Sequence, residues 1–264
     1  MQLSQLWSYK HTFKELIKTD LLVLRPQILG KIIDLFIWII TIVLVNAYIM
    51  PFFGVSAEYG VFMLASSAAS AGLFEIWPSV TVFISDLEGE KSINYYLTLP
   101  IPSWMVLVRS ILNCAMNAAI MGLLVIPIGK LFVWSLLDMS TISWFKYFII
   151  FVLSCVFYGS FSLWTMSFVK NMLSVGSVWM RFIYPLWFLG CFQFSWQSLY
   201  QMSPVLAYLN LLNPMTYVSE GFRASILGQQ NSLNFWLCAS MLIVFTVAMG
   251  AQAILRLKKR LDFV

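Results

Sequence analysis

The stretch DLEGEKSINYYLTLPIPSWMVLVR, residues 86–109, lies between two long apolar runs and sets the arrangement expected for the rest of the chain. It contains three acidic residues, two prolines and two tyrosines. Exposed polar groups in the core of a bilayer cost several kcal/mol, so this stretch cannot cross a membrane as it stands. We interpret it as a folded elbow on the cytoplasmic side, placed between two membrane helices to contact a soluble partner. A solvated loop that only reverses the chain is the alternative.

The composition is typical of a membrane protein. Of the 264 residues, 61% are hydrophobic and 10% are charged, whereas soluble domains average about 25% charged residues. The mean hydropathy is +0.85. We therefore predict an all-α polytopic membrane protein with a single membrane domain over residues 1–264. In such a chain the net charge of +5 reports topology and does not indicate a nucleic-acid partner.

Six apolar runs are long enough to cross a membrane, which takes about 20 residues. They cover residues 28–50, 59–84, 104–128, 147–168, 172–194 and 235–255. Residues 1–26 predict an amphipathic helix at the membrane surface, with Lys10, Lys14 and Lys18 near anionic lipid. Docking of this helix on a partner protein is the alternative. Arg25-Pro26 is expected to break the chain before the first span.

Ionisable residues inside the spans need a protein or water environment. Lys31 and Asp34 lie three residues apart and are expected to pair on one helix face. Glu75, deep in the second span, is interpreted either as a hydrogen-bonded structural group or as a group on a transport pathway. Arg109 and two asparagines at four-residue spacing predict a polar stripe that faces the helix bundle.

Residues 196–231 are too apolar for a free loop and too interrupted for a straight span, so we expect broken, re-entrant helices there. Ser203-Pro204 and Asn213-Pro214 are suitable helix starts, and Leu227-Gly228 is a suitable stop. Glu220 and Arg223 lie three residues apart and are expected to neutralise each other. Residues 27–195 then hold the first five spans and the elbow at 86–103, and residues 232–264 hold the sixth span and a basic tail.

The basic residues predict the orientation. Six spans place both termini on one side of the membrane, and an excess of Lys and Arg marks the cytoplasmic side. Only Lys130, Lys146 and Arg223, out of 16 basic residues, fall on the other side, which leaves 13 for the side of the termini. We therefore expect a multi-pass protein of the cytoplasmic (inner) membrane with both termini in the cytoplasm. The elbow is then cytoplasmic and the broken helices face outward.

Sequence patterns of membrane enzymes are absent. The chain has one histidine and contains neither HExxH nor GxSxG. The segment 122–130 departs from a phosphate-binding loop in its glycine spacing and ends in Lys-Leu, where Ser or Thr should follow the lysine. We expect no catalytic site, cofactor or metal in this chain. Energy for any uphill transport must therefore come from another protein or from an ion gradient.

Two segments resemble a known family. LLNPMTYVSEGFRASILG, residues 211–228, resembles the NP-x-x-Y-x-x-x-G-F-R motif that precedes the last span of type-2 ABC exporter permeases. The elbow resembles the segment between spans two and three of that family, where acidic residues precede a short helix and an L-x-L-P-I-P-like exit. The overall plan of six spans also agrees. One departure is Lys91-Ser92, which stands where many members have Gly-Thr.

The resemblance implies partners and site residues. Two copies of the permease, or two related permeases, would pair in the membrane, with a homodimer expected. Each would dock an ATP-binding subunit that holds ATP and magnesium. The expected coupling residues are Asp86, Glu88, Glu90, Lys91 and Tyr95. The expected lining of the translocation path is Phe36, Trp38, Glu75, Trp179, Tyr184 and Trp187. The expected outer gate consists of Asn213, Pro214, Tyr217, Glu220 and Arg223.

The cargo and the class of function stay open at this point. The aromatic residues of the fifth span fit export of a glycan, a glycolipid or a lipid-linked polymer, and they fit a drug-like amphipathic molecule almost as well. Aromatic residues also belong at lipid interfaces. The alternatives to an exporter are an integral membrane enzyme or scaffold without an ATPase, and an ion-coupled carrier that uses Glu75.

Overall fold

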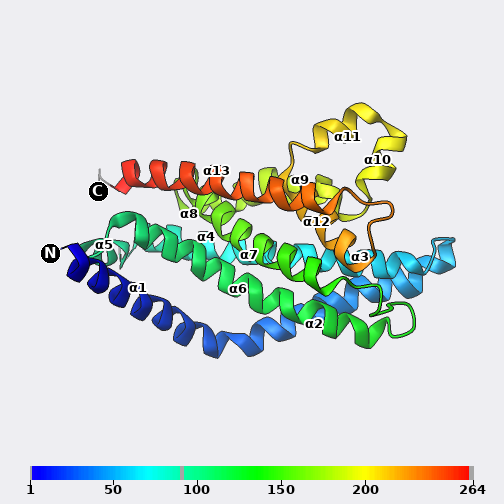
Figure 1. The fold of residues 1–264 in the computed structure, drawn as a ribbon, viewed down its shortest axis with the longest axis horizontal. Coiled ribbons are helices and arrows are strands. Elements are labelled where there is room, and N and C mark those ends of the chain that lie inside the picture. Colours follow the sequence, from blue (N-terminus) through cyan, green and yellow to red (C-terminus); the bar gives the residue numbers. More distant parts are fainter. Residues whose placement is uncertain (1, 90–91, 262–264) are drawn as a thin grey trace.

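A computed structural model describes residues 2–89 and 92–261 of the chain (Figure 1). Helices make up 83% of it, and the described residues contain no strand. The principal helices are α1 (Gln2–Leu24), α2 (Ile28–Val43), α3 (Glu58–Ser70), α4 (Ile76–Glu88), α5 (Ser92–Thr98), α6 (Ser103–Phe132), α7 (Trp144–Met166), α8 (Met172–Val178), α9 (Tyr184–Trp187), α10 (Trp196–Met202), α11 (Pro204–Asn210), α12 (Pro214–Ile226) and α13 (Phe235–Leu261).

The predicted number of membrane spans is confirmed, because six helical stretches of the described chain are long and apolar enough to cross a membrane. They are Tyr9–Phe53, Glu58–Glu88, Ser103–Phe132, Trp144–Met166, Met172–Phe192 and Phe235–Arg260. Both ends of the chain lie at the same end of this helical bundle (Figure 1). We call it the termini end and the opposite one the far end.

The first span contains a correction. Arg25-Pro26 does not break the chain, because Arg25–Gln27 forms a 3-10 turn that joins α1 to α2 in one helical stretch. Proline is tolerated in the first turn of a helical segment, where its missing N–H would have no partner. The two helices meet at a bend, and α1 runs beside α6 toward the termini end (Figure 1).

The core of the bundle is built around α7, which packs against α6, α13, α4 and α12. Helices in lipid approach closely where small residues face each other. A Cβ added at Gly159 would overlap the carbonyl oxygen of Ile111, so α6 and α7 touch backbone to backbone. The Ser66–Gly72 region of the second span is buried in the same way, and the Tyr158 hydroxyl donates to Ala69 O at 2.5 Å.

The second and fifth spans are interrupted helices. A 3-10 turn, Leu73–Glu75, separates α3 from α4. The fifth span alternates α-helix with two π-helical segments, Trp179–Ile183 and Phe188–Phe192. Its helical geometry ends at Gly190 and Cys191, where Cys191 has a φ of 59°. Pro185 lies in the first turn of α9.

Residues 196–226 form the broken helices expected from the sequence. The short helices α10 and α11 form a hairpin that projects at the far end (Figure 1). Ser195 caps α10 and Asn213 caps α12, each with a side-chain oxygen that accepts a backbone N–H. Helix α12 is buried along its whole length. The hairpin is not, because α10 has no buried residue and α11 has one, Ala207.

Candidate functional site

The elbow at the termini end is held from α4. The two carboxylate oxygens of Asp86 accept the backbone N–H groups of Ser92 and Ile93, each at 2.9 Å. These N–H groups open α5 and would otherwise have no partner within that helix. Asp86 therefore fixes the start of the elbow helix, which is an internal role for a residue expected to contact a partner.

Helix α5 is also tied to α6 and α1. Arg109 in α6 donates to both oxygens of Asp20 in α1, at 2.8 and 2.6 Å. Its guanidinium lies 4.1 Å from the centre of the Tyr96 ring of α5. The pair is well buried, with side chains 12% and 9% exposed. One arginine thus links three elements at the termini end.

The other predicted coupling residues differ in accessibility. Glu88 accepts the backbone N–H of Met172 at 3.2 Å and so connects α4 to the start of α8. Tyr95 is 66% exposed and touches only its neighbour Tyr96 among the aromatic side chains described. Glu90 and Lys91 lie outside the described residues. Of the described coupling residues, Glu88 and Tyr95 are exposed and Asp86 is partly buried.

The membrane-embedded ion pair differs from the prediction. Lys31 does not pair with Asp34; its Nζ donates to both oxygens of Glu75, at 2.6 and 2.5 Å. The side chains are 15% and 6% exposed. Glu75 ends the 3-10 turn between α3 and α4, so this pair fastens α2 to the break in the second span. Glu75 is therefore hydrogen-bonded inside the subunit, and its part in a transport pathway stays a prediction. Asp34 is exposed.

Three of the six residues predicted to line a path form one aromatic cluster. The Trp38 ring lies 4.8 Å from Phe74 and 6.2 Å from Trp187, and Trp187 lies 5.6 Å from Tyr184. Trp187 also donates its ring N–H to Ser70 Oγ at 2.8 Å.

Two predicted lining residues lie apart from this cluster. Trp179 of the fifth span packs on Trp77 of α4, with ring centres 5.5 Å apart. Phe36 packs at 5.5 Å on Phe132 of α6 instead. The structure therefore brings together Trp38, Tyr184 and Trp187 around the second span, and it does not bring Phe36 to them.

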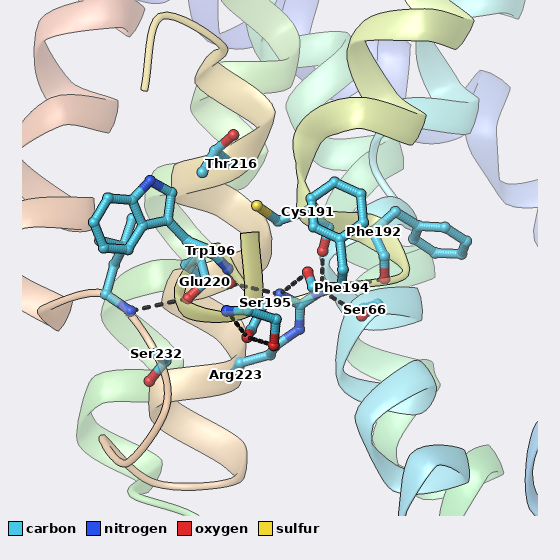
Figure 2. Close-up of polar contacts among 12 residues, drawn as sticks. Ser66, Cys191, Phe192, Phe194, Ser195, Trp196, Thr216, Glu220, Arg223 and Ser232 are labelled. Atoms are coloured by element: carbon cyan, nitrogen blue, oxygen red, sulfur yellow. Dashed lines mark hydrogen bonds and ion pairs between the residues drawn. The ribbon is translucent and has the colours of Figure 1, made fainter. Parts of the chain in front are cut away.

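The predicted Glu220–Arg223 pair is present and forms the centre of a larger network, shown in Figure 2 and called here the α12 hub. Glu220 Oε1 accepts from Arg223 at 2.7 Å and from the Trp196 backbone N–H at 2.9 Å. Glu220 Oε2 accepts the Leu233 N–H at 2.9 Å. One carboxylate thus joins α12 to the start of α10 and to the segment before α13.

Arg223 completes the hub on the other side (Figure 2). It donates to Ser66 Oγ at 2.9 Å, to the carbonyl oxygens of Phe192 and Phe194 at 3.1 Å, and to Cys191 O. The side chains of Arg223 and Glu220 are 2% and 0% exposed. Broken backbone at the end of the fifth span leaves carbonyl oxygens without helical partners, and the guanidinium supplies the donors that they need.

The remaining residues of the predicted outer gate are also buried attachment points. Asn213 accepts the Met215 N–H at 3.0 Å and donates to Leu186 O of α9 at 2.7 Å. Pro214 is in the first turn of α12, and the Tyr217 hydroxyl donates to Leu211 O at 2.7 Å. The gate residues therefore connect α12 to the fifth span inside one subunit. Their part in gating stays a prediction.

The sequence pattern identified most of the ionic residues but did not identify their partners. Asp20 was not singled out, although it holds Arg109 across 89 positions of the chain. Ser66 was noted only as a small residue, although it accepts from Arg223 across 157 positions. The available signal for Asp20 was that it is one of two acidic residues, with Glu15, in a segment rich in lysine.

Comparison with known proteins adds no assignment: no protein-family model matches the chain, and no curated protein matches it. The described residues contain no group of three or more His, Cys, Asp or Glu side chains that could hold a metal ion.

Proposed function

We propose that this chain is the membrane subunit of an ATP-driven exporter and that a separate ATP-binding subunit drives it through the elbow. The observation that carries the proposal is the way in which α5 is attached to the neighbouring helices. This short helix is fixed to α4 by Asp86 and to α1 and α6 by Arg109, while Tyr95 remains exposed. A force applied to α5 by a partner is therefore transmitted to three membrane helices.

The absence of an ATP-binding motif from the sequence supports an energy source in a partner protein. Without a phosphate-binding loop the chain has no P-loop route to ATP hydrolysis. An ATP-bound partner can shift the subunit between two states only if it binds one of them more tightly. The rigid mounting of α5 provides a means, because a change in its position changes the position of α1, α4 and α6. In this proposal the protein lies in the inner membrane, and its termini end faces the cytoplasm.

A second copy of the chain covers the exposed charges within the spans. Asp34 in α2 and Arg181 in the fifth span are exposed, and neither has an ion-pair partner among the described residues. A charge facing lipid at depth costs about 2.5–3.5 kcal/mol or more. In a two-fold dimer, Asp34 of one copy can pair with Arg181 of the partner subunit, and the reverse pair forms by symmetry.

A charge reversal tests the dimer. Asp34→Arg is expected to abolish the dimer, Arg181→Asp is expected to do the same, and the two together are expected to restore it. The measurement is the mass of the purified complex in lipid nanodiscs. Lys31→Arg, a neighbouring change that keeps the internal Glu75 pair, is the control. A dimer unaffected by either reversal would contradict this arrangement.

The cargo proposed is a glycan, a glycolipid or a lipid-linked polymer, with a drug-like amphipathic molecule as the competing class. The aromatic side chains of α2, α4 and the fifth span support both. Trp179→Ala is expected to reduce export while sparing assembly. Trp187→Ala is expected also to destabilise the protein, because Trp187 is buried and bonded to Ser70. Export at the wild-type rate in Trp179→Ala would assign that residue to packing or lipid contact.

Two alternatives remain distinguishable. An integral membrane enzyme or scaffold would act without an ATPase. An ion-coupled carrier would use Glu75, but the direct pairing of Glu75 with Lys31 favours a structural role for that carboxylate. Transport driven by an ion gradient in vesicles that lack ATP would favour the carrier.

The proposed function is tested by co-expression with an ATP-binding subunit encoded by an adjacent gene. The purified chain is expected to bind that subunit and to change its rate of ATP hydrolysis. Glu88→Arg combined with Glu90→Arg is expected to prevent association while membrane insertion stays normal. Lys14→Glu, on the exposed side of α1, is a matched charge change away from the elbow. The proposal would be refuted if the wild-type chain neither bound the subunit nor altered its turnover.

A further inference from the structure

The far end contains a large pocket that the proposed coupling and path residues leave unexplained. Its volume is about 880 Å³, within the range of roughly 300–1,000 Å³ typical of small-molecule sites. It lies between the start of α3, the loop between α6 and α7, helix α10 and the loop between α12 and α13. Its wall reaches the hub, since Ser195, Arg223 and Ser232 line it (Figure 2).

The pocket is lined by uncharged amides. Gln197 and Gln201 stand four residues apart on α10 and so lie on one face of that helix. Gln230 and Asn231 face the pocket from the loop before α13. All four side chains are exposed, and within the described chain none has a hydrogen-bond partner in the protein. Each amide offers both donors and an acceptor, which is the combination that ligand hydroxyl groups require.

An aromatic surface accompanies the amides. Tyr59 and Phe62, one helical turn apart on α3, stack with ring centres 5.4 Å apart and planes at 15°. The Arg223 guanidinium lies 4.0 Å from the Phe62 ring and completes the support. Rings held in this way present an apolar face beside polar groups, and the C–H face of a sugar ring packs on such a surface.

The charges around the pocket disfavour an anion. The Arg223 charge is already paired with Glu220. Glu58 and Asp138 add two exposed carboxylates to the lining. The Ser140 backbone N–H donates to Asp138 at 2.8 Å, and this bond lowers the pKa of the Asp138 carboxyl, which is therefore ionised at neutral pH. This negative charge would repel an acidic ligand, whereas it would not repel a neutral one.

We propose that this pocket binds a neutral saccharide at the far end of the subunit. Hydroxyl groups bond the four amides, and one ring face packs against the Tyr59–Phe62 stack. The binding itself needs no ATP-binding subunit. The statement that the saccharide is the exported cargo rests on the proposed function.

Binding is measured by saturation-transfer NMR and calorimetry on the full chain in nanodiscs of phosphatidylethanolamine and phosphatidylglycerol. Alkyl-glycoside detergents are avoided because their headgroups are sugars. The probes are maltotriose, a galacturonic acid trimer and a glucosamine trimer. Maltotriose is expected to bind saturably and to bind at least several-fold more tightly than the acidic trimer. Tighter binding of either charged trimer would overturn the assignment to a neutral saccharide.

Variants assign the binding to this pocket. Gln197→Leu with Gln201→Leu removes two hydrogen-bonding groups and keeps good helix formers, so maltotriose binding is expected to weaken by about tenfold or more. Gln230→Ala, on the opposite wall, is expected to weaken it several-fold, which covers the case that α10 unfolds. Gln27→Leu changes an exposed amide distant from the pocket and is the control.

The outcomes separate the pocket from the transport proposal. No saturable maltotriose binding, or equal binding by the wild type and the pocket variants, would overturn the saccharide site. Saccharide binding by a chain that fails to associate with any ATP-binding subunit would keep the pocket and refute the exporter. If both hold, the double glutamine variant is expected to lose export of a glycan while retaining ATPase association.

Discussion

The elbow and the α12 hub are both organised by an arginine–carboxylate pair, and they differ in what remains exposed. In the hub, Glu220 and Arg223 are enclosed and bonded to four other segments of the chain. In the elbow, Arg109 and Asp20 hold one side of α5, and Tyr95 on the same helix is 66% exposed. The comparison indicates that the hub holds together the fold of one subunit. The elbow helix α5 is instead attached to the protein on one side and exposed on the other.

Breaking the hub should have the largest effect. Arg223→Met leaves Glu220 buried without its cation, and removal of one member of a buried pair costs about 3–5 kcal/mol. We expect little monodisperse protein after extraction, with a strongly lowered melting temperature in what remains. The double variant Glu220→Gln with Arg223→Met should recover part of the loss. Wild-type melting of the single variant would show that the hub is not a structural centre.

The matching change at the elbow should cost less. Arg109→Met leaves Asp20 without its partner and releases Tyr96, but water can reach this pair more easily than the hub. We expect a loss of about 2 kcal/mol in the free energy of unfolding. Hydrogen exchange should increase in α5 and stay unchanged in α12. An equal increase in both helices would contradict the independence of the two regions.

Two glycines provide a smaller test. A Cβ at Gly190 would overlap the Met215 side chain and approach its backbone, so Gly190→Ala should force α12 away from the fifth span at a cost of about 1–2 kcal/mol. A Cβ at Gly89, in the elbow, would meet Ser85 O at 3.1 Å and no other atom of the described residues within 4 Å. Gly89→Ala should therefore cost less. Thermal melting of both variants gives the order, and the reverse order would contradict the tight packing assigned to the hub.

The smallest effect on stability is expected at Tyr95. Tyr95→Ala removes an exposed ring and should change the free energy of unfolding by less than about 0.5 kcal/mol. Binding of the ATP-binding subunit should nevertheless weaken, because this ring is an exposed part of α5. Phe168→Ala, which also changes a partly exposed aromatic residue near the termini end, is the comparison. Equal binding by wild type and Tyr95→Ala would remove Tyr95 from the interface.

The sequence predicts the spans and the short-range Glu220–Arg223 pair. It does not predict the long-range contacts, and the other short-range pair that it favoured, Lys31–Asp34, is wrong. Runs of apolar residues determine where a helix can cross a membrane, so the six spans could be predicted. Glu220 and Arg223 are three residues apart on one helix, so their pairing could be predicted as well. The Lys31–Glu75 pair joins residues 44 positions apart, and helix spacing favoured Asp34 instead. Tertiary packing decides between such partners.

The breaks inside the spans were also beyond the sequence pattern. The fifth span contains Pro185, yet its non-helical residues are Gly190 and Cys191. The reason is packing, because Gly190 lets α12 approach the fifth span and Arg223 binds the carbonyl oxygens that the break releases. A proline can be read from the sequence, whereas a break stabilised by a distant arginine cannot.

The most direct measurement of the central claim is the amount of ATP-binding subunit that co-purifies with this chain. The wild type should retain one ATP-binding subunit for each copy. The variant Glu88→Arg with Tyr95→Ala should retain none while remaining folded and inserted in the membrane. Absence of the subunit from the wild-type preparation, or equal amounts with both proteins, would contradict the role given to the elbow.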